Sequence, residues 1–382
     1  MNSVYVLGGA TTKFGELWNV SPRDLVREVA TRVLDDSGVS KDKIDAVFVG
    51  NMLSGALGNQ EHLGAFFSEE LGLTCSAMRV EGACASGGLA VHSGVMSILS
   101  GMYKTVLVIG VEKMTDFRPE DVAMELMGAG SDPEREAGAT FPALYALIAR
   151  AHMTRYGTTE EDMAEVAVKN HYHASQNPNA HFPVSITVDK VMRSSVVATP
   201  LKLLDCSPIS DGAAAVILSS QIKPSQKRVS IAASVVATDT LGVAQRTDLT
   251  TLAATVRAAQ KAYRDSGINP SDIDVAEVHD CFSIAEIIAM EDLGFFPKGK
   301  AAKAIRDGKT KLGGRPVVNI SGGLKASGHP VGATGVKQVV EIYQQLKGIA
   351  GNRQVRGAKI GLTHNVGGSG ATAVIHILKA QK

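Results

Sequence analysis

The feature that most constrains the fold is a repeat that the chain carries in two distant places. Residues 36–45 read DSGVSKDKID and residues 265–274 read DSGINPSDID. A stretch with helical spacing precedes each copy, and a short apolar stretch typical of a strand follows each copy. A chain that repeats this order of elements is expected to fold as two similar halves.

Two further parallels occur in the same order in both parts of the chain. Residues 212–218 (GAAAVIL) match residues 370–376 (GATAVIH), and residues 106–110 match residues 360–363. We expect the first pair of segments to be helices and the second pair to be strands, each strand preceded by a Gly-rich loop and a helix. The alternation of strands and helices predicts an α/β protein with two duplicated halves related by a pseudo-twofold axis.

An insertion interrupts the first half. The region 116–204 is richer in charge, Met, His and Asn than its surroundings. We therefore predict an N-terminal half made of residues 1–115 and 205–225, an inserted loop domain over 116–204, and a C-terminal half over 226–382. An insertion beside a site commonly forms a lid or a substrate wall.

Composition excludes several classes of function. The 39 Lys and Arg residues balance the 38 Asp and Glu residues, so no bulk charge indicates nucleic acid or a membrane surface. No apolar stretch reaches membrane-spanning length, the first apolar run reads as a strand rather than a signal peptide, and the last residues are not a peroxisomal address. None of the four cysteines forms a CxxC pair. We predict a soluble protein of the reducing cytoplasm.

Residues 81–88 (EGACASGG) place Cys84 among very small residues, and a run with helical spacing follows. Cys84 is therefore expected at a helix start, where unpaired N–H groups favour the thiolate and lower the thiol pKa. The small neighbours are expected to let a ligand approach the backbone. Taken alone, a buried cysteine that packs a helix start is the more common interpretation.

Two segments carry histidines beside such a site. His279-Asp280-Cys281-Phe282 directly follows a predicted strand, and ligands of open α/β sheets lie outside the carboxyl ends of strands. His329 lies in the Gly-rich stretch 322–335, and the following proline holds it at a loop–helix junction. An imidazole there can act as a base toward a thiol or as a donor to an oxyanion.

Three other segments are less specific. The Gly-rich residues 364–370 (HNVGGSG) are expected between a strand and a helix, as an oxyanion site, a tight turn or a phosphate cradle, although GxGxxG and Walker A sequences are missing. Residues 206–212 read as a capped turn before a helix. His171, His173 and His181 lack a carboxylate or cysteine at ligand spacing, so we predict no metal.

The duplication gives a physical reason for a shared site. Cys84 and His329 occupy comparable loop–helix junctions in the two copies, and a pseudo-twofold axis brings such junctions together at the centre. We expect Cys84, His279, Cys281, His329 and Gly367 to meet in one crevice.

The motifs resemble those of the thiolase family over essentially the whole chain. Residues 328–335 (GHPVGATG) are similar to the thiolase histidine motif, and Cys84 lies in the context of the acyl-carrying cysteine. The block at 279–282 and residues 12–15 (TKFG) resemble sterol-carrier-protein-type and archaeal thiolases. Most thiolases carry a second cysteine in a Cys-x-Gly motif where this chain has Asn365, and in the subgroup the cysteine corresponding to Cys281 replaces it. The resemblance implies a five-layered α-β-α-β-α fold.

The resemblance also implies a reaction. His329 helps to deprotonate Cys84, whose thiolate takes an acetyl group from acetyl-CoA while the N–H groups of Cys84 and Gly367 stabilise the oxyanion. Cys281 then deprotonates a second acetyl-CoA, and His329 with a water held by His279 stabilises the enolate. The product is acetoacetyl-CoA, and coenzyme A enters only as substrate and product, with no other cofactor.

Further expectations concern CoA and partners. Ser207 matches the family serine that lies along the pantetheine, and Cys206 and Lys325 are added as CoA contacts, with a solvated loop position as the alternative for Lys325. The resemblance implies a homodimer or homotetramer in isoprenoid (mevalonate) synthesis and a complex with hydroxymethylglutaryl-CoA synthase.

Three alternative functions are weighed against acetoacetyl-CoA synthesis. The first is a degradative 3-ketoacyl-CoA thiolase for longer chains, because the pocket wall lies in 116–204. The second is a non-enzymatic scaffold or acyl carrier, and the third is a ketoacyl-carrier-protein synthase. Retention of Cys84, His279, Cys281 and His329 disfavours the second, and a cysteine two residues after a histidine at 279–281 disfavours the third.

Overall fold

The element order of the computed structural model repeats itself, and the structure describes residues 3–222 and 228–381. The first half comprises β1 (Tyr5–Thr11), α1 (Pro22–Ser37), β2 (Ala46–Gly50), α2 (Leu63–Leu71), β3 (Ser76–Val80), α3 (Ser86–Leu99), β4 (Thr105–Glu112) and β7 (Gly212–Ser219). The second half comprises β8 (Arg228–Thr238), α9 (Ala253–Ser266), β9 (Val275–Glu277), α10 (Ser283–Asp292), α11 (Ala301–Arg306), β10 (Val317–Val318), α12 (Gly323–Ser327), α13 (Val331–Lys347), β11 (Ile360–Gly367) and β12 (Thr372–Gln381). Apart from α11 and α12, the two series correspond element by element, as the duplication predicts.

The strand order shows the pseudo-twofold axis. The strands follow one another as β10-β9-β11-β12-β8-β1-β7-β4-β2-β3, so the second five positions repeat the first five in reverse with the corresponding strands. The axis passes between β8 and β1, which meet at the single antiparallel pair Tyr5 and Ser230. Each half therefore contributes five consecutive strands, and the two sets of five pair with each other at β8 and β1 to give one ten-stranded order.

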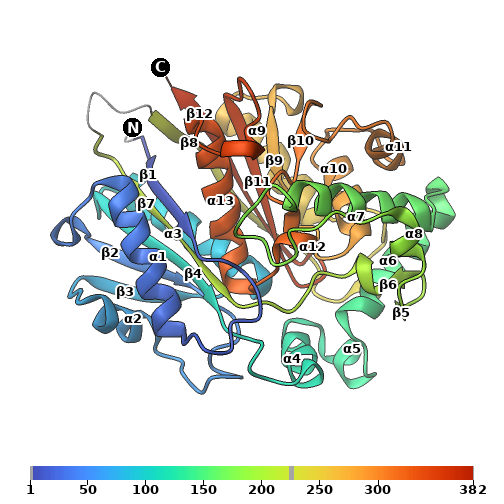
Figure 1. Ribbon diagram of the computed structural model, residues 1–382, viewed down its shortest axis with the longest axis horizontal. Coiled ribbons are helices and arrows are strands. Elements are labelled where there is room, and N and C mark those ends of the chain that lie inside the picture. Colours follow the sequence, from blue (N-terminus) through green and yellow to red (C-terminus); the bar gives the residue numbers. More distant parts are fainter. Residues whose placement is uncertain (1–2, 223–227, 382) are drawn as a thin grey trace.

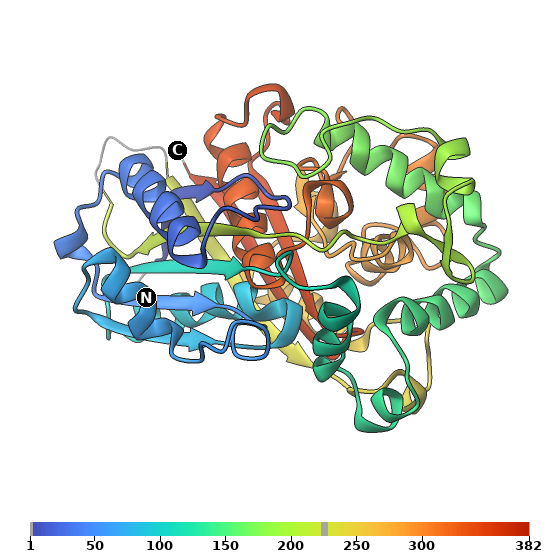
Figure 2. The same cartoon turned by 60° about the horizontal axis from the view of Figure 1, so that its bottom comes forward.

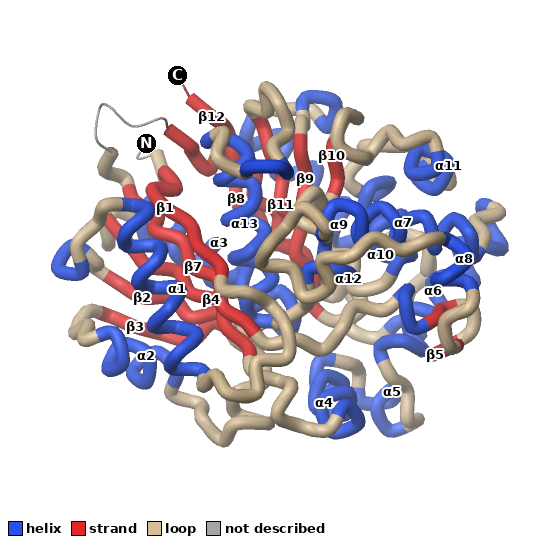
Figure 3. The backbone as a smooth tube through the Cα atoms, in the orientation of Figure 1, coloured by secondary structure: helices blue, strands red, loops and turns tan. Residues whose placement is uncertain are grey.

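Five layers result from this arrangement. The corresponding helices α3 and α13 pack on each other and lie between the two sheets, in contact with β4 on one side and with β11, β12 or β8 on the other. The outer faces are covered by α1 and α2 in the first half and by α9 and α10 in the second. Figures 1 and 2 show the blue first half on the left and the orange and red second half on the right, with α13 between them in Figure 1. Figure 3 shows the strands in red, with α1 and α2 beside those of the first half and α13 between the strands of the two halves.

Local signals explain the repeated helix ends. The Ser21 side chain accepts a hydrogen bond from the backbone N–H of Asp24, and the Asp24 carboxylate accepts one from the backbone N–H of Ser21. These two bonds form a capping box at the start of α1. Gly38 ends α1 with a φ of 64°, and Gly267 ends α9 with a φ of 66°. These glycines belong to the repeated DSG triplets, so the repeat marks a helix end and the strand that follows.

The expectation of helices at 212–218 and 370–376 is wrong, because both segments are strands, β7 and β12. Every residue of β7 is buried, and the strand lies between β1 and β4. A short apolar run fits a fully buried strand as well as a buried helix by periodicity alone. The correspondence between the two segments holds, but Gly370 consequently lies in a turn between two strands.

The insertion packs beside the second half, in green in Figure 1. It contains α4 (Pro119–Leu126), α5 (Asp132–Glu136), α6 (Phe141–Tyr156), α7 (Glu160–Ala174), α8 (Val188–Met192), β5 (Val196–Ala198) and β6 (Leu201–Lys202). Helix α7 contacts α10, α11 and α12. The predicted boundary at 225–226, the first two residues and Lys382 lie outside the described residues. Within residues 3–222 and 228–381, the helices are all too short or too polar to cross a bilayer.

Candidate active site

Cys84 lies in a short turn between β3 and α3. The turn is the 3-10 helix Ala83–Ala85, and α3 begins directly afterwards. Ser86 fixes it, because its Oγ accepts from Gly82 N at 3.0 Å and donates to Ala83 O at 2.6 Å. The predicted helix-start position of Cys84 is therefore correct.

The small residues after Cys84 make room for a helix rather than for a ligand. A Cβ atom on Gly87 would lie 2.6 Å from the carbonyl oxygen of Gly332 at the start of α13, and a Cβ on Gly88 would lie 2.9 Å from Asn365 Oδ1. Contacts this short exclude any side chain. At these two positions the expected ligand space is occupied by α13 and β11.

His329 is held at the start of α13 from two sides. Its backbone N–H donates to Ser210 Oγ at 3.2 Å, and its Nδ1 lies 2.7 Å from Thr334 Oγ1. The Thr334 hydroxyl donates to the carbonyl of Pro330 at 3.0 Å, so it accepts from His329 Nδ1–H. The remaining nitrogen, Nε2, then carries a lone pair and can act as a base.

The block at 279–282 follows β9 and is fastened to its surroundings. Asp280 accepts from the backbone N–H groups of Leu324 at 2.7 Å and Lys325 at 3.3 Å, which ties the block to α12 just before His329. The Cys281 carbonyl accepts from Ser207 N at 2.9 Å, which ties the block to the loop before β7. The structure thus joins three distant segments at this point.

The predicted catalytic side chains converge. Cys84 Sγ and one nitrogen each of His279 and His329 all lie within 4.8 Å of one another, and the two imidazole ring centres are 5.1 Å apart at 82°. Together with Cys281 they line one cavity of about 500 Å³. Its wall also includes residues of the insertion and of the loop before β7, namely Tyr145, Phe141, Pro142, Leu126, Phe182, Cys206, Ser207 and Ile209.

Burial dominates the electrostatics of the cavity. It raises the pKa of the Cys84 thiol to about 12 against a hydrogen bond from the Gly368 backbone that lowers it, and it raises the pKa of Cys281 as well. Burial lowers the pKa of His329 to about 3 and that of His279 well below its usual value. The direction is opposite to the lowering expected from a helix start, because burial outweighs the backbone N–H groups, and neutral thiols face neutral imidazoles in this cavity.

The remaining predicted residues divide into two groups. Ser207 and Cys206 line the cavity, and Cys206 pairs with Phe282 across an isolated bridge. Gly367 ends β11, and its neighbour Gly368 is the glycine that lines this cavity. Lys325 is only 2% exposed and donates to the Leu204 carbonyl at 3.4 Å, so the solvated-loop alternative is wrong and the side chain lies behind the cavity wall.

The three insertion histidines contact three different partners. His171 contacts the Val184 carbonyl, His173 the Asn319 carbonyl and His181 the Ser210 hydroxyl. Across residues 3–222 and 228–381, the one group of three or more such side chains close enough to share an ion is Cys84, His279 and His329. A soft cation there would occupy the position of a reacting acyl group.

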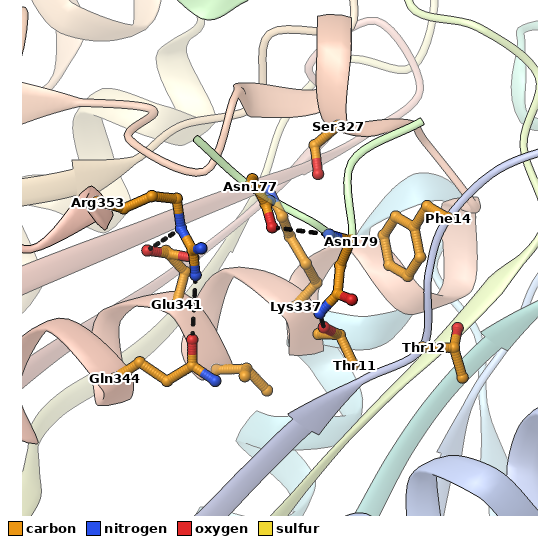
Figure 4. A pocket seen from close by; sticks show the side chains of 11 residues that line it. Thr11, Thr12, Phe14, Asn177, Asn179, Ser327, Lys337, Glu341, Gln344 and Arg353 are labelled. Atoms are coloured by element: carbon orange, nitrogen blue, oxygen red, sulfur yellow. Dashed lines mark hydrogen bonds and ion pairs between the residues drawn. The ribbon is translucent and has the colours of Figure 1, made fainter. Parts of the chain in front are cut away.

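A second cavity is too small for a substrate. It has a volume of about 20 Å³, and its lining includes Lys337 and Glu341 of α13 and the insertion residues Asn177 and Asn179 (Figure 4). Arg353 pairs with Glu341 at 3.1 Å across it. This space fits one or two waters among paired polar groups.

Sequence reasoning missed one cavity residue, Tyr145, and two supporting residues, Thr334 and Asn365. The Tyr145 hydroxyl comes from the insertion, contacts the Cys281 thiol and donates to the Gly368 carbonyl at 3.3 Å. Thr334 belongs to the recognised motif, yet its contact with His329 becomes visible only in the folded helix. Asn365 was noted only as a departure from a motif, and in the structure it contacts both Cys84 and His279.

Family profiles and curated relatives match nearly the whole chain. The profile described as "Thiolase, N-terminal domain" matches residues 4–222, and "Thiolase C-terminal domain-like" matches residues 235–380. A protein named acetyl-CoA acetyltransferase from Methanothermobacter thermautotrophicus is 51% identical, with 99% of each chain covered. One of the same name from Methanocaldococcus jannaschii is 44% identical, with both chains fully covered. Sterol carrier protein 2 of Gallus gallus is 35% identical over 97% of this chain and 71% of its own.

Solved structures share the fold. An Ltp2-ChsH2(DUF35) aldolase superposes with a TM-score of 0.85 at 23% identity, covering 99% of this chain and 98% of its own. An acetyl-CoA acetyltransferase from Syntrophomonas wolfei gives a TM-score of 0.77 at 21% identity, covering 99% of each chain. These similarities support the duplicated architecture.

Proposed function

The chain belongs to the thiolase family, and from that premise we propose that it is an acetyl-CoA C-acetyltransferase that joins two acetyl-CoA molecules through an acetyl-Cys84 intermediate. The observation that carries the proposal is the meeting of Cys84, His279, Cys281 and His329 in one cavity. The choice of acetyl as the transferred group rests on the names of the two archaeal relatives. Coenzyme A enters as part of the substrate and leaves as product, and we propose no further cofactor.

The first half-reaction uses the lone pair of His329. Its Nε2 accepts the proton of the Cys84 thiol, and the thiolate attacks the carbonyl carbon of acetyl-CoA. Backbone N–H groups of Cys84 and of the turn at Gly367 and Gly368 donate to the tetrahedral oxyanion. The C–S bond to CoA breaks, Cys281 gives its proton to the leaving sulfur, and CoA departs as the free thiol.

The second half-reaction uses the thiolate that remains on Cys281. It removes a proton from the methyl group of a second acetyl-CoA, while His279 and protonated His329 donate to the enolate oxygen. The carbanion attacks the acetyl carbon on Cys84, and the C–S bond breaks to release acetoacetyl-CoA. His329 returns its proton to Cys84, so two acetyl-CoA yield one acetoacetyl-CoA and one CoA.

Trapping of the acyl-enzyme tests this function. Radiolabelled acetyl-CoA is expected to label Cys84, and Cys84→Ala is expected to abolish labelling and acetoacetyl-CoA formation. Cys75→Ala serves as the matched control, because Cys75 is a half-buried cysteine outside the cavity. A Cys84→Ala enzyme that still forms acetoacetyl-CoA would end the proposal.

The cavity wall supports degradative thiolysis of longer 3-ketoacyl-CoA as a second candidate. The residues that the insertion contributes are mainly apolar, including Leu126, Phe141 and Pro142, and they line a cavity larger than an acetyl group requires. Steady-state cleavage of acetoacetyl-CoA and of a longer 3-ketoacyl-CoA separates the two functions. A strong preference for the longer substrate would replace acetoacetyl-CoA synthesis as the main activity.

The physiological setting belongs to the same proposal. We expect a reducing compartment such as the cytoplasm, because Cys84 and Cys281 react as thiols, and all four cysteines are free. Acetoacetyl-CoA would feed isoprenoid synthesis by the mevalonate route. We further expect a homodimer or homotetramer and a complex with hydroxymethylglutaryl-CoA synthase, which light scattering of the purified protein and of its mixture with that enzyme would test.

A further inference from the structure

Asn365 is buried at the point where the two central helices meet. It lies in β11 and is 1% exposed. A Cβ atom on Gly335 of α13 would come within 2.2 Å of its Oδ1, and one on Gly88 of α3 within 2.9 Å. The side chain therefore fills a space that both helices leave open, and its position is fixed by close packing.

Two backbone groups determine the orientation of the Asn365 amide. Oδ1 accepts from the backbone N–H of Gly88 at 3.0 Å, and Nδ2 donates to the backbone carbonyl of Cys84 at 3.0 Å. A backbone N–H can only donate and a carbonyl can only accept, so exchanging the amide oxygen and nitrogen would break both bonds. The amide has one satisfactory orientation.

This orientation settles the tautomer of His279. Asn365 Nδ2 lies 3.2 Å from His279 Nδ1, and an amide nitrogen has protons to donate but no lone pair to accept with. His279 Nδ1 must therefore be the acceptor. In a neutral imidazole the proton then sits on Nε2, which is buried and has no hydrogen-bond partner among residues 3–222 and 228–381.

The two histidines of the cavity consequently present opposite groups to it. His329 is bonded through Nδ1–H to Thr334 and offers a lone pair, whereas His279 is bonded at Nδ1 by Asn365 and offers an N–H. A buried N–H without a partner is costly, and the cost is relieved when an anionic oxygen enters the cavity. His279 is thus prepared as a donor to a developing oxyanion rather than as a base.

We propose that Asn365 is a positioning residue that holds His279 in the Nε2–H tautomer, so that His279 donates to the thioester or enolate oxygen of the substrate. This inference rests on the proposed acetyl transfer, since it assigns the role of one residue in that reaction. The tautomer itself is a property of the free protein and is measured without substrate.

The first experiment is nitrogen NMR of protein labelled in its histidine side chains. The signals of His279 are identified by their loss in His279→Ala. The wild-type protein is expected to show His279 with a protonated Nε2 and an unprotonated Nδ1, and Asn365→Asp is expected to place a proton on Nδ1, because a carboxylate can only accept. A protonated Nδ1 in the wild-type protein would overturn the proposal whether or not the protein has acetyltransferase activity.

The second experiment is a double-mutant cycle on kcat/KM for acetoacetyl-CoA formation. Asn365→Ala is expected to lower kcat/KM by about 10- to 100-fold, below the 10²–10³ typical of a lost oxyanion donor. In the His279→Ala background the same change is expected to cost less than about threefold, because the residue to be positioned is gone. An equal loss in both backgrounds would show that Asn365 acts only through the Cys84 turn and would refute the proposal.

The matched control is Asn177→Ala. Asn177 is also a buried asparagine that donates to a backbone carbonyl, that of Ser321 at 2.9 Å, but it lies outside the reactive cavity. It is expected to change kcat/KM by less than about threefold. A comparable loss in the control would assign the effect of Asn365→Ala to general disruption of packing.

Discussion

In the first half, the last residue of β4 is Glu112, whereas the corresponding end of β11 carries Asn365 and Gly367. Glu112 is buried and accepts four hydrogen bonds, from the Asn51 side chain and from the backbone of Met52, Leu53 and Gly332. These bonds connect the end of β4 to the loop after β2 and to the start of α13. At the corresponding end of the second sheet, His279 Nε2 has no hydrogen-bond partner within the part of the chain that the structure describes.

The difference shows how one scaffold serves two purposes. The first half contributes a single reactive side chain, Cys84. At the end of its strand β4, the Glu112 carboxylate is already hydrogen-bonded within the protein. The second half contributes His279, Cys281 and His329. The Nε2 atoms of both histidines are left to interact with a substrate in the cavity. Glu112 thus holds the loop after β2 and the start of α13 in place and does not line the reactive cavity.

The largest expected effect is loss of the sulfur that the first half supplies. Cys84→Ala is expected to lower kcat on the order of 10⁴-fold or more, because no other group can carry the acyl intermediate. His329→Ala is expected to cost a similar factor without adding to it in the double variant, since the two residues act as one unit. Steady-state rates of the single and double variants measure this. Additive losses in the double variant would show that Cys84 and His329 act independently and not as one unit.

The next effect distinguishes the two cysteines of the site. Cys281→Ala is expected to lower condensation by about 10²–10⁴-fold, the usual contribution of a general acid–base group. Acetylation of Cys84 should become slower, because Cys281 protonates the leaving CoA sulfur, but acetyl-Cys84 should still accumulate, and mass spectrometry of the acyl-enzyme reads it directly. Loss of acetylation to the extent seen in Cys84→Ala would mean that Cys281 is indispensable for the first half-reaction and not only for the second.

The sequence predicted the parts of this comparison that are encoded locally. Repeated triplets and capping residues predicted the duplicated helix ends, and the motifs around Cys84 and His329 predicted loop–helix junctions, all of which the structure contains. The apolar run at 212–218 did not reveal whether it was a strand, because its identity depends on neighbours at β1 and β4. The sequence alone favoured a lowered Cys84 pKa, whereas the depth of the cavity, which only the fold determines, raises it.

The sequence predicted that the motif residues meet, but not which individual side chains support them from distant positions. Asn365 bonds Gly88 across 277 positions and Cys84 across 281, and Tyr145 reaches Cys281 from the insertion. Such pairs carry no spacing signal. Lys325 shows the same limit, because its flanking glycines resemble those of an exposed loop although the residue is buried.

A third prediction tests how closely the halves must approach. Gly335→Ala would place a Cβ atom 2.1 Å from the backbone nitrogen of Gly88, a contact that requires α3 and α13 to move apart. We expect a loss of about 3 kcal/mol in the free energy of unfolding, near the upper range for overpacking. Chemical denaturation measures it, with Gly128→Ala as a control, because a Cβ there meets nothing within 4 Å. Equal stability of the two variants would show that the helix contact is looser than described.

The smallest expected effect concerns acid. His376 in β12 is buried and contacts the Gly88 carbonyl at 3.2 Å, whereas the repeat places the apolar Leu218 at the corresponding position of β7. Burial lowers the pKa of His376 to about 3, so between about pH 3 and 6.5 the unfolded chain binds the additional proton. Stability therefore falls as the pH drops through this window, by up to about 1.4 kcal/mol per pH unit for each such histidine.

Replacing His376 sharpens this difference between β12 and β7. His376→Gln is expected to flatten the fall in the free energy of unfolding between pH 6.5 and 4.5 by about 1 kcal/mol per pH unit, because one proton-binding group is removed from the unfolded chain. The exposed His62→Gln is the control and should leave the slope unchanged. If His376→Gln retained the wild-type slope of the free energy of unfolding against pH, other buried histidines would cause the acid sensitivity. The replacement of Leu218 in β7 by His376 in β12 would then have no effect on stability in acid.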